Sequence, residues 1–182
     1  MRHAIELAQR ERRVVIMLEP IALYMTRDLL TEADNGWGGN YPNADQPLPK
    51  LGQPSVYGNG KKVGIISYGN GYYLSRQACA RLNAEQQIKV IDLRYLVPLD
   101  MGQVMQAIDD CEQLLIVDEC RQRGSLSEEI ITYLAEHDAQ RRPVQRITAD
   151  DCFIPLGSAA YDVLPSAADI ESALTAMGVT QQ

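Results

Sequence analysis

Residues 63–124 alternate between short apolar runs and stretches with helical periodicity, and this alternation constrains the fold more than any other feature of the sequence. The apolar runs are typical of buried strands and cover residues 63–68, 88–93 and 113–118. Between them, helices are predicted over about residues 71–84 and 100–110, the second with Asp100 as its N-cap. Strands that alternate with helices form an open parallel sheet, so we predict an α/β fold.

The same pattern continues to the C-terminus. We predict a helix over about residues 124–138, a strand over 144–148 and a closing helix over 167–177. With helices on both faces, the result is a three-layer α/β sandwich on a mainly parallel sheet, which occupies residues 61–182. At 182 residues, the chain is long enough to bury a hydrophobic core without disulfides or metals.

The N-terminal third lacks this regularity. Residues 2–12 have an amphipathic pattern that predicts a short helix, and Val14–Leu18 is an apolar run of the kind found in buried strands. Residues 24–60 carry repeated prolines and glycines and no strand or helix period, which predicts a long irregular linker. Trp37 and Tyr41 are the side chains expected to anchor this linker by packing.

The composition disfavours several classes of partner. A net charge of −7 and a pI near 4.8 argue against binding to nucleic acid or to an anionic membrane surface. None of the four cysteines lies within four residues of another, so zinc or redox spacing is not present and free thiols are expected. No apolar run approaches the ~20 residues of a membrane span, and residues 1–13 lack the apolar core of a signal peptide. These features predict a cytoplasmic protein.

Several short motifs occur in an order that matches a known family. They are Ile66-Ser67-Tyr68-Gly69, Val90-Ile91-Asp92-Leu93-Arg94 with Pro98-Leu99-Asp100, Val117-Asp118-Glu119 with Gly124 and Glu128-Glu129-Ile130, Ile154-Pro155, and Leu164-Pro165-Ser166. On these residues, the segment 61–178 resembles the C-terminal domain of the transketolase-like thiamine-diphosphate enzymes. It is most similar to the beta part of the dehydrogenase component of 2-oxo acid dehydrogenase complexes.

The residues ahead of the linker extend the resemblance. Leu18-Glu19-Pro20-Ile21-Ala22-Leu23-Tyr24 resembles the end of the pyrimidine-binding domain of the same family. Met25-Thr26-Arg27-Asp28-Leu29 is most similar to the form in which the alpha and beta parts are fused. The resemblance implies that residues 1–23 are the last helix and strand of that domain. It also implies that the domains that hold thiamine diphosphate and magnesium are missing, so this chain alone should bind neither cofactor and should carry no catalytic residue.

The resemblance implies a parent enzyme that oxidatively decarboxylates a 2-oxo acid and passes the acyl group to a lipoyl group. The choice of 2-oxo acid is not encoded in this portion. The expected role of this chain is assembly, through homodimer contacts and through contacts with the missing domains or alpha part. Transketolase and deoxyxylulose-phosphate synthase are alternatives within the superfamily, and residues 18–29 disfavour both by resemblance.

The turn Gly69-Asn70-Gly71 is the candidate for ligand binding. It follows a strand and opens a helix, so its backbone N–H groups can face an anion. The dinucleotide-binding pattern is incomplete, because Leu74 stands where its third glycine belongs. A tight structural turn is the simpler interpretation. If the turn does bind an anion, the chain is instead a free-standing binding or regulatory module, which is the alternative hypothesis for its function.

Two further groups of residues are candidates for contacts with a partner. Polar and aromatic side chains near the ends of two central strands are placed to line a domain interface, and they are Tyr68, Tyr72, Tyr73, Asp118, Glu119, Arg121 and Arg123. Solvated charges and boundary packing are the alternative interpretation. Glu128 and Glu129 give the predicted 124–138 helix an acidic side. In the family, this domain takes part in docking a small basic domain of the acyltransferase core, so the resemblance implies docking here, with a solvated helix face as the alternative.

Overall fold

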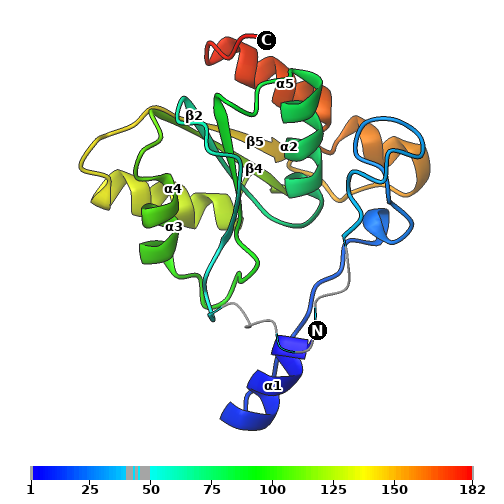
Figure 1. Cartoon of the computed structure of the whole chain (residues 1–182), viewed down its shortest axis with the longest axis vertical. Helices are drawn as coiled ribbons and strands as arrows, with labels where there is room; N and C mark the ends of the chain where they lie inside the picture. The colour runs from blue at the N-terminus through cyan, green and yellow to red at the C-terminus, as the bar shows by residue number, and fades with distance from the viewer. Residues whose placement is uncertain (1, 40–42, 44, 46–49, 182) are drawn as a thin grey trace.

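The computed structural model describes residues 2–39, 43, 45 and 50–181, and these residues form a five-stranded sheet at the centre of the molecule (Figure 1). The strands are β1 (Ser55–Tyr57), β2 (Val63–Ser67), β3 (Ile88–Asp92), β4 (Gln113–Arg121) and β5 (Val144–Ala149). They lie in the order β1-β3-β2-β4-β5. β1 runs antiparallel to β3, whereas the β3–β2, β2–β4 and β4–β5 pairs are parallel. The predicted α/β class and mainly parallel sheet are confirmed.

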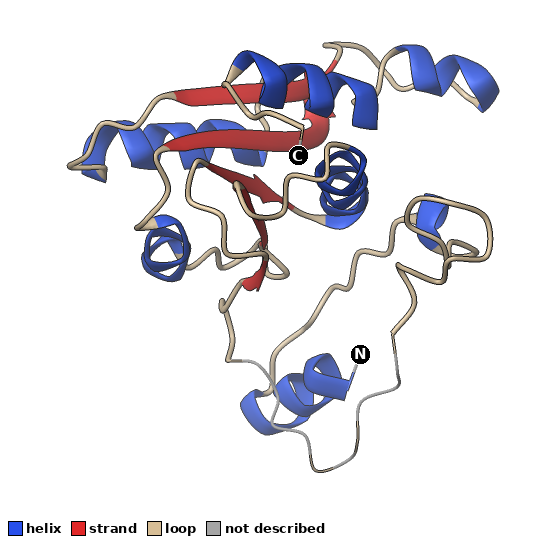
Figure 2. Cartoon of the chain, turned by 45° about the horizontal axis from the view of Figure 1, so that its top comes forward, coloured by secondary structure: helices blue, strands red, loops and turns tan. Residues whose placement is uncertain are grey.

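Helices cover both faces of the sheet, which gives the predicted three layers (Figure 2). The helices are α2 (Gly69–Arg81), α3 (Met101–Ile108), α4 (Leu126–His137) and α5 (Ala167–Ala176). α2 and α5 pack on the face that carries Ile65 and Leu115, whereas α3 and α4 pack on the face of Ile66 and Ile116. Because successive strand residues point to opposite faces, a strand covered on both sides is apolar throughout. Accordingly, every residue of β2 is buried.

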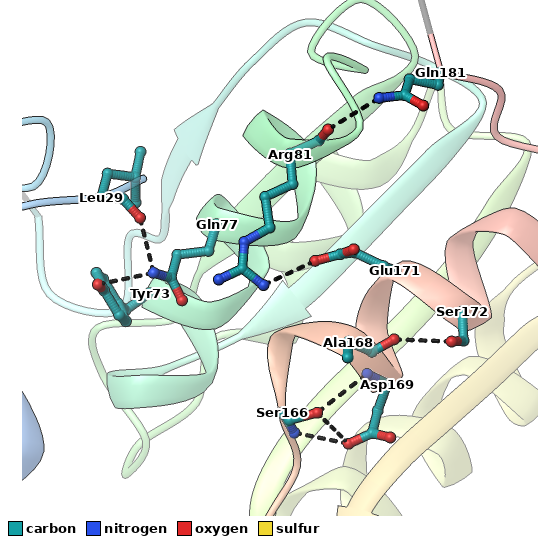
Figure 3. A network of polar contacts seen from close by, with 10 residues as sticks. All are labelled: Leu29, Tyr73, Gln77, Arg81, Ser166, Ala168, Asp169, Glu171, Ser172 and Gln181. Carbon is teal, nitrogen blue, oxygen red and sulfur yellow. Dashed lines mark hydrogen bonds and ion pairs between the residues drawn. The ribbon is translucent and has the colours of Figure 1, made fainter. Parts of the chain in front are cut away.

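Capping side chains fix the start of two of these helices. Asp100 Oδ1 accepts a hydrogen bond from a backbone N–H in the first turn of α3 at 3.1 Å, which confirms the predicted N-cap. Ser166 and Asp169 form a capping box at the start of α5, each accepting from the other's backbone N–H (Figure 3). Arg81 and Glu171 join α2 to α5 at 3.1 Å.

The predicted strand at Val14–Leu18 is absent. The predicted N-terminal helix is present as α1 (Arg2–Glu11), but residues 12–20 follow it without regular structure, and residues 13–19 make no backbone hydrogen bond to other described residues. Val14 and Ile16 are 93% and 82% exposed. The prediction was wrong because an apolar run becomes a buried strand only beside a sheet that covers it, and no described strand lies beside this one.

The described residues of the linker include a short strand and a loop that is held together by its own hydrogen bonds. β1 pairs with β3 at the edge of the sheet, and sequence analysis missed it. In the loop, the carboxylate of Asp34 accepts hydrogen bonds from the backbone N–H groups of Leu29, Leu30, Thr31 and Gly36. These bonds hold the pKa of Asp34 well below its usual range. This loop is therefore irregular in secondary structure but specific in its hydrogen bonding.

This loop is fixed to α2. Gln77 Nε2 donates to the carbonyl of Leu29 at 2.8 Å (Figure 3), and the Tyr73 hydroxyl donates to the carbonyl of Asp28 at 3.0 Å. Trp37 packs against the ring of Tyr73, with centroids 4.9 Å apart. Trp37 thus has the anchoring position predicted for it, whereas Tyr41 lies outside the described residues.

Candidate functional site

The carboxyl ends of β2 and β4 lie side by side where the connections change direction across the sheet. From β2 the chain crosses through α2 to β3, and from β3 it returns through α3 to β4 on the other side of β2. Open α/β sheets place ligands in the crevice at such a switch point. Here the switch point is flanked by residues 68–71 after β2 and by residues 118–120 in β4.

Asp118 is buried at this edge and accepts several hydrogen bonds. Its Oδ1 accepts from the Tyr68 hydroxyl at 2.7 Å and from the backbone N–H of Cys120 at 3.0 Å, and its Oδ2 accepts from the backbone N–H of Ser127 at 3.0 Å. Burial raises the pKa of this carboxyl, but the hydrogen bonds outweigh burial and hold the pKa below its usual range. Asp118 is therefore ionised at neutral pH. Burial likewise raises the pKa of Tyr68, which keeps its phenol protonated as the donor.

The same carboxylate caps α4, a role that sequence analysis missed. Ser125 occupies the N-cap position of α4, but its hydroxyl makes no capping hydrogen bond and lies 2.7 Å from Ser127 Oγ. Asp118 instead accepts the N–H of Ser127 in the first turn, and Glu128 Oε2 accepts from the N–H of Gly124 at 2.8 Å. An ionised carboxylate stabilises a helix N-terminus, where partial positive charge gathers. Asp118 thereby links β4 to the start of α4.

Glu119 faces the opposite side of β4. Its Oε1 accepts from Asn70 Nδ2 at 2.6 Å, at the start of α2. Burial raises the pKa of Glu119, and the hydrogen bond from Asn70 offsets part of that rise. The ladder between β4 and β5 shifts register between Asp118 and Arg121, so the strand bulges at this point. The two adjacent carboxyls therefore bond to different helices rather than converging on one site.

Both glycines of the turn Gly69-Asn70-Gly71 have structural reasons to be glycine. Gly69 has a φ of +56°, which glycine adopts without strain. A Cβ at position 71 would lie 2.5 Å from Ser67 Oγ. Asn70 is bonded to Glu119, which places a carboxyl group beside the turn. Anion binding at this turn stays a prediction, and a neighbouring carboxylate opposes it.

Tyr72 and Tyr73 have partners within the chain. Both rings pack against Trp37, with centroids 5.7 and 4.9 Å away. The guanidinium of Arg76 lies 3.3 Å from the ring centroid of Tyr57 in β1 and donates to the Tyr72 hydroxyl at 3.2 Å. These half-buried rings join the linker and β1 to α2, and their predicted contact with another domain stays a prediction.

Arg121 and Arg123 remain exposed at the end of β4. Arg123 Nε lies 3.5 Å from Asp151 Oδ2, and Arg121 Nε donates to the carbonyl of Arg123 at 3.1 Å. A shallow recess of about 140 Å³ beside them is lined by Arg121, Asp151, Cys152 and Phe153. Phe153 is 96% exposed. These side chains are accessible to a partner, as the predicted interface requires.

A larger open groove, of about 620 Å³, lies on the α3–α4 side of the sheet. Its lining includes Leu51, Pro98, Asp100, Glu129 and Tyr133. The two carboxylates make the groove acidic. Glu128 and Glu129 were predicted to dock a basic partner. Glu129 lines this groove, whereas Glu128 accepts a hydrogen bond from the backbone N–H of Gly124, just ahead of α4.

The described residues contain no cluster of three or more His, Cys, Asp or Glu side chains that could hold a metal ion. All four cysteines are free, with Cys79 and Cys111 buried and Cys120 and Cys152 exposed. Burial raises the pKa of the Cys79 thiol to about 12. None of the helices in this part of the chain is long and apolar enough to cross a membrane.

Comparison with known families identifies this architecture. Residues 52–170 match the family model described as transketolase, C-terminal domain. The match covers more than half of the chain and includes the sheet, the switch point and every lining residue of the groove except Leu51. The chain belongs to the transketolase C-terminal domain family, and the resemblance inferred from its motifs is confirmed at this level.

Several curated proteins are similar to this chain. It is 28% identical over 172 residues to the beta subunit of acetoin:2,6-dichlorophenolindophenol oxidoreductase of Cupriavidus necator, covering 85% of this chain and 51% of that protein. It is 26% identical over 174 residues to the beta subunit of the pyruvate dehydrogenase E1 component of Rhizobium meliloti, covering 93% and 35%. It is 28% identical over 145 residues to the 1-deoxy-D-xylulose-5-phosphate synthase of Halothermothrix orenii, covering 79% and 22%. The chain thus spans about half or less of the length of these relatives.

The likeness extends ahead of the family match, because the alignment to the Rhizobium meliloti subunit covers 93% of the chain. Among solved structures, a split-gene transketolase, described as an inactive beta4 tetramer, matches with a TM-score of 0.62 and 20% identity. The match covers 78% of this chain and 48% of that one. At this identity, the likeness establishes the fold alone.

Proposed function

We propose that this chain is the C-terminal part of the dehydrogenase component of a 2-oxo acid dehydrogenase complex. The parent enzyme oxidatively decarboxylates a 2-oxo acid and transfers the acyl group to a lipoyl group, with thiamine diphosphate and magnesium as cofactors. This part serves assembly, through self-association, contact with the domains or alpha part that hold the cofactor, and docking to the acyltransferase core. Similarity to pyruvate dehydrogenase E1 beta subunits supports the choice of enzyme.

The observation that carries the assembly role is the apolar surface left uncovered in two segments. Ahead of the linker, Val14 and Ile16 are 93% and 82% exposed, and Met25 at the start of the linker is 89% exposed. Between β5 and α5, Phe153 and Leu156 are each 96% exposed. Single exposed apolar residues are ordinary, but runs of them mark surfaces that contact another protein. These segments are therefore proposed to be covered by other parts of the enzyme.

The chemistry of the switch point favours the same role. A general acid or base needs a pKa near the working pH and access to the substrate. Asp118 is held ionised by donors from its own chain, and its oxygens bond to Tyr68 and to the start of α4. We propose that this carboxylate sets the position of α4, and that the decarboxylation chemistry belongs to the cofactor-holding parts of the enzyme.

The relatives support the proposed enzyme class more broadly than they support the proposed substrate. The thiamine-diphosphate enzyme class is supported by the beta subunits and by the 1-deoxy-D-xylulose-5-phosphate synthase alike. The 2-oxo acid substrate is supported by the pyruvate and 2-oxoisovalerate dehydrogenase subunits, the latter from Bacillus subtilis with 30% identity over 119 residues. A direct test is to mix this chain with the cofactor-holding part of such an enzyme and to measure whether the two form a complex that resists proteolysis. Such a complex would support the assembly role by experiment and not by similarity alone.

Calorimetric titration of the purified chain with thiamine diphosphate and magnesium tests the proposal. We expect no binding heat from the chain alone, with a complete 2-oxo acid dehydrogenase component as the positive control in the same buffer. Light scattering on the same sample should show self-association. Stoichiometric cofactor binding by the chain alone would contradict the proposal that other parts of the enzyme hold the cofactor, because it would require cofactor-holding residues within this part.

Docking to the acyltransferase core is tested at the acidic groove. Glu129→Lys should weaken binding of the basic subunit-binding domain of the source organism's acyltransferase by about tenfold or more, because it reverses a charge in the groove. Glu136→Lys is the matched control, since Glu136 is 66% exposed on the same helix but does not line the groove. If the two substitutions weaken binding equally, the groove is not the docking site, and Glu129 belongs to an ordinary solvated helix face.

A further inference from the structure

Three asparagines of this chain stand directly before a glycine, and they are Asn35, Asn59 and Asn70. An Asn-Gly step is especially open to deamidation, because glycine has no Cβ to hinder attack by its backbone nitrogen on the asparagine side chain. The fold places the three steps in the linker loop that Asp34 holds together, in the irregular connection between β1 and β2, and in the first turn of α2. Their surroundings therefore decide which of them reacts.

The reaction needs a backbone nitrogen that can lose its proton and a side chain that can approach it. The nitrogen of the glycine bonds to Cγ of the asparagine, its proton passes to solvent, and the side-chain nitrogen leaves as ammonia. Water then opens the cyclic imide at either carbonyl, which gives aspartate or isoaspartate. A hydrogen bond that holds the N–H, or a carboxylate beside it, slows the first step, because both oppose formation of a negatively charged nitrogen.

The step at Asn35 is exposed, but hydrogen bonds hold it on both sides. Gly36 N donates to Asp34 Oδ1 at 2.7 Å, so loss of its proton would leave an anion beside an ionised carboxylate. The Asn35 side chain donates to the carbonyl of Ala33 at 3.1 Å, and its backbone N–H donates to Asp28 Oδ1 at 2.9 Å. Ring closure at this step would break hydrogen bonds that hold the linker loop together.

The step at Asn70 is held by α2 and by β4. Asn70 Nδ2 donates to Glu119 Oε1 at 2.6 Å, which ties the side-chain amide to β4. Ring closure requires the asparagine backbone to leave the helical range of ψ, and Asn70 lies inside α2. The next residue, Gly71, is buried, and a Cβ there would lie 2.5 Å from Ser67 Oγ, so the backbone has little room to rotate.

The step at Asn59 has the least protection. Asn59 is exposed in the connection between β1 and β2, and its side chain makes no hydrogen bond to the described residues. The N–H that must react is bonded to a neutral acceptor, since Gly60 N donates to the carbonyl of Ile88 at 3.2 Å. This bond lies next to the edge strand β1, which is only three residues long, and such edges open locally at low cost in free energy.

We propose that Asn59 deamidates spontaneously in the folded chain, and that the fold protects Asn35 and Asn70. Each product adds a negative charge between β1 and β2, and isoaspartate also lengthens the main chain. The main chain is closely packed here, since a Cβ on Gly60 would lie 2.0 Å from Ile88 N. Isoaspartate therefore breaks the hydrogen bond between Gly60 and Ile88 and loosens β1 from β3. This modification is independent of the enzyme to which the chain belongs.

Deamidation rates in the folded and the unfolded chain test the proposal. The purified chain is kept in mildly alkaline buffer with and without urea, and peptide mapping by mass spectrometry follows conversion of each amide to an acid. In urea the three steps should react at similar rates, because the protecting contacts are lost. In the folded chain Asn59 should react about tenfold or more faster than Asn35 and Asn70.

Variants of the linker loop test the cause of the protection. Asp34→Ala frees the N–H of Gly36 and should raise the rate at Asn35 toward its rate in urea, while the rate at Asn59 stays unchanged. Glu32→Ala is the matched control, since Glu32 is an exposed acid of the same loop that makes no hydrogen bond to the described residues. Amide hydrogen exchange in β1 should be faster in aged, deamidated chain than in fresh chain.

Several results would overturn the proposal. If Asn35 or Asn70 reacts as fast as Asn59 in the folded chain, the contacts of these residues do not protect them. If none of the three steps reacts while the urea sample does, the bond between Gly60 and Ile88 protects Asn59 as well. If Glu32→Ala speeds the reaction at Asn35 as much as Asp34→Ala does, the hydrogen bond to Gly36 is not the cause of protection. Equal amide exchange of β1 in aged and fresh chain would refute the loosening of this strand.

Discussion

Replacing Asp138 by alanine should destabilise the fold far more than loss of a surface ion pair. Asp138 and Arg142 join the end of α4 to the approach to β5, with side chains only 4% and 3% exposed. Arg142 Nη2 donates to Asp138 Oδ1 at 2.8 Å and its Nε to Oδ2 at 3.0 Å. Arg142 also donates to the carbonyl of Ile108 at the end of α3. Removing the carboxylate would leave a buried guanidinium without its counter-charge.

The magnitude follows from that burial. Breaking one side of a buried ion pair costs about 3–5 kcal/mol, because the remaining charge stays desolvated. Against a total stability of about 5–15 kcal/mol, this is a large fraction. For a chain of this size the melting temperature should fall by roughly 6–20 °C. Urea unfolding followed by far-UV circular dichroism measures the change in free energy.

Two further variants separate the ion pair from simple loss of contacts. Asp138→Leu combined with Arg142→Met should restore most of the stability, because no unpaired charge remains in the core. Arg81→Ala, which breaks the more exposed pair with Glu171, should cost about 1 kcal/mol or less. If Asp138→Ala costs no more than Arg81→Ala, the buried pair does not carry the free energy assigned to it.

The same pair sets a pH dependence. The hydrogen bond from Arg142 lowers the pKa of Asp138 from 3.8 to about 2. Because the folded pKa is depressed, the stabilisation is present above the unfolded pKa and is lost as the pH falls from about 4 to about 2. That shift is worth about 2 kcal/mol. The stability difference between wild type and Asp138→Ala should therefore shrink over this window, and a difference that stays constant would refute the linkage.

Three substitutions near the switch point and the groove give further tests. Gly71→Ala should cost about 1–3 kcal/mol, because its Cβ would lie 2.5 Å from Ser67 Oγ, and adding Ser67→Ala should recover part of the loss in scanning calorimetry. Asp100→Ala should cost about 1 kcal/mol by removing the N-cap of α3, measured as a urea midpoint. Tyr68→Phe should cost about 1.5–3 kcal/mol at neutral pH, because the ionised carboxylate of Asp118 loses a hydrogen-bond donor. The difference should shrink in acid, as the pH falls from the ordinary pKa of an aspartate toward the lowered pKa of Asp118 in the folded chain.

The parallel strands and their helices could be predicted because their signals are local. Strands β2 and β4 are buried on both faces, so their residues form continuous apolar runs that stand out from the helical segments between them. Asp100 precedes the helix that it caps, so its role is also readable from the sequence. β1 carries no such signal, because it is three residues long and Val56 at its centre is 46% exposed at the edge of the sheet.

The candidate site was harder to predict because its bonds join distant residues. The Tyr68 hydroxyl donates to Asp118, which lies 50 residues further along the chain, and the Asn70 amide donates to Glu119, which lies 49 residues further along. The residues were identified as candidates from their place at strand ends, but the sequence does not show that they bond to each other. For Val14–Leu18, the local apolar signal was clear and the predicted strand was still wrong, since strand formation depends on a neighbouring strand and not on the apolar run alone.

Burial of the exposed apolar side chains in an assembly is favoured by free energy, whereas anion binding at the turn Gly69-Asn70-Gly71 is opposed by a neighbouring carboxylate. An anion at Gly69–Gly71 would approach Glu119, whose carboxylate is bonded to the Asn70 amide, so binding would place like charges together or require that bond to break. Covering the exposed apolar residues of Val14–Leu18 carries no such cost. Full burial of a side chain such as Val14, Ile16 or Leu18 by another part of the enzyme is worth about 1.5–3 kcal/mol. Even partial cover of these side chains offsets a substantial share of the about 4–15 kcal/mol lost on association.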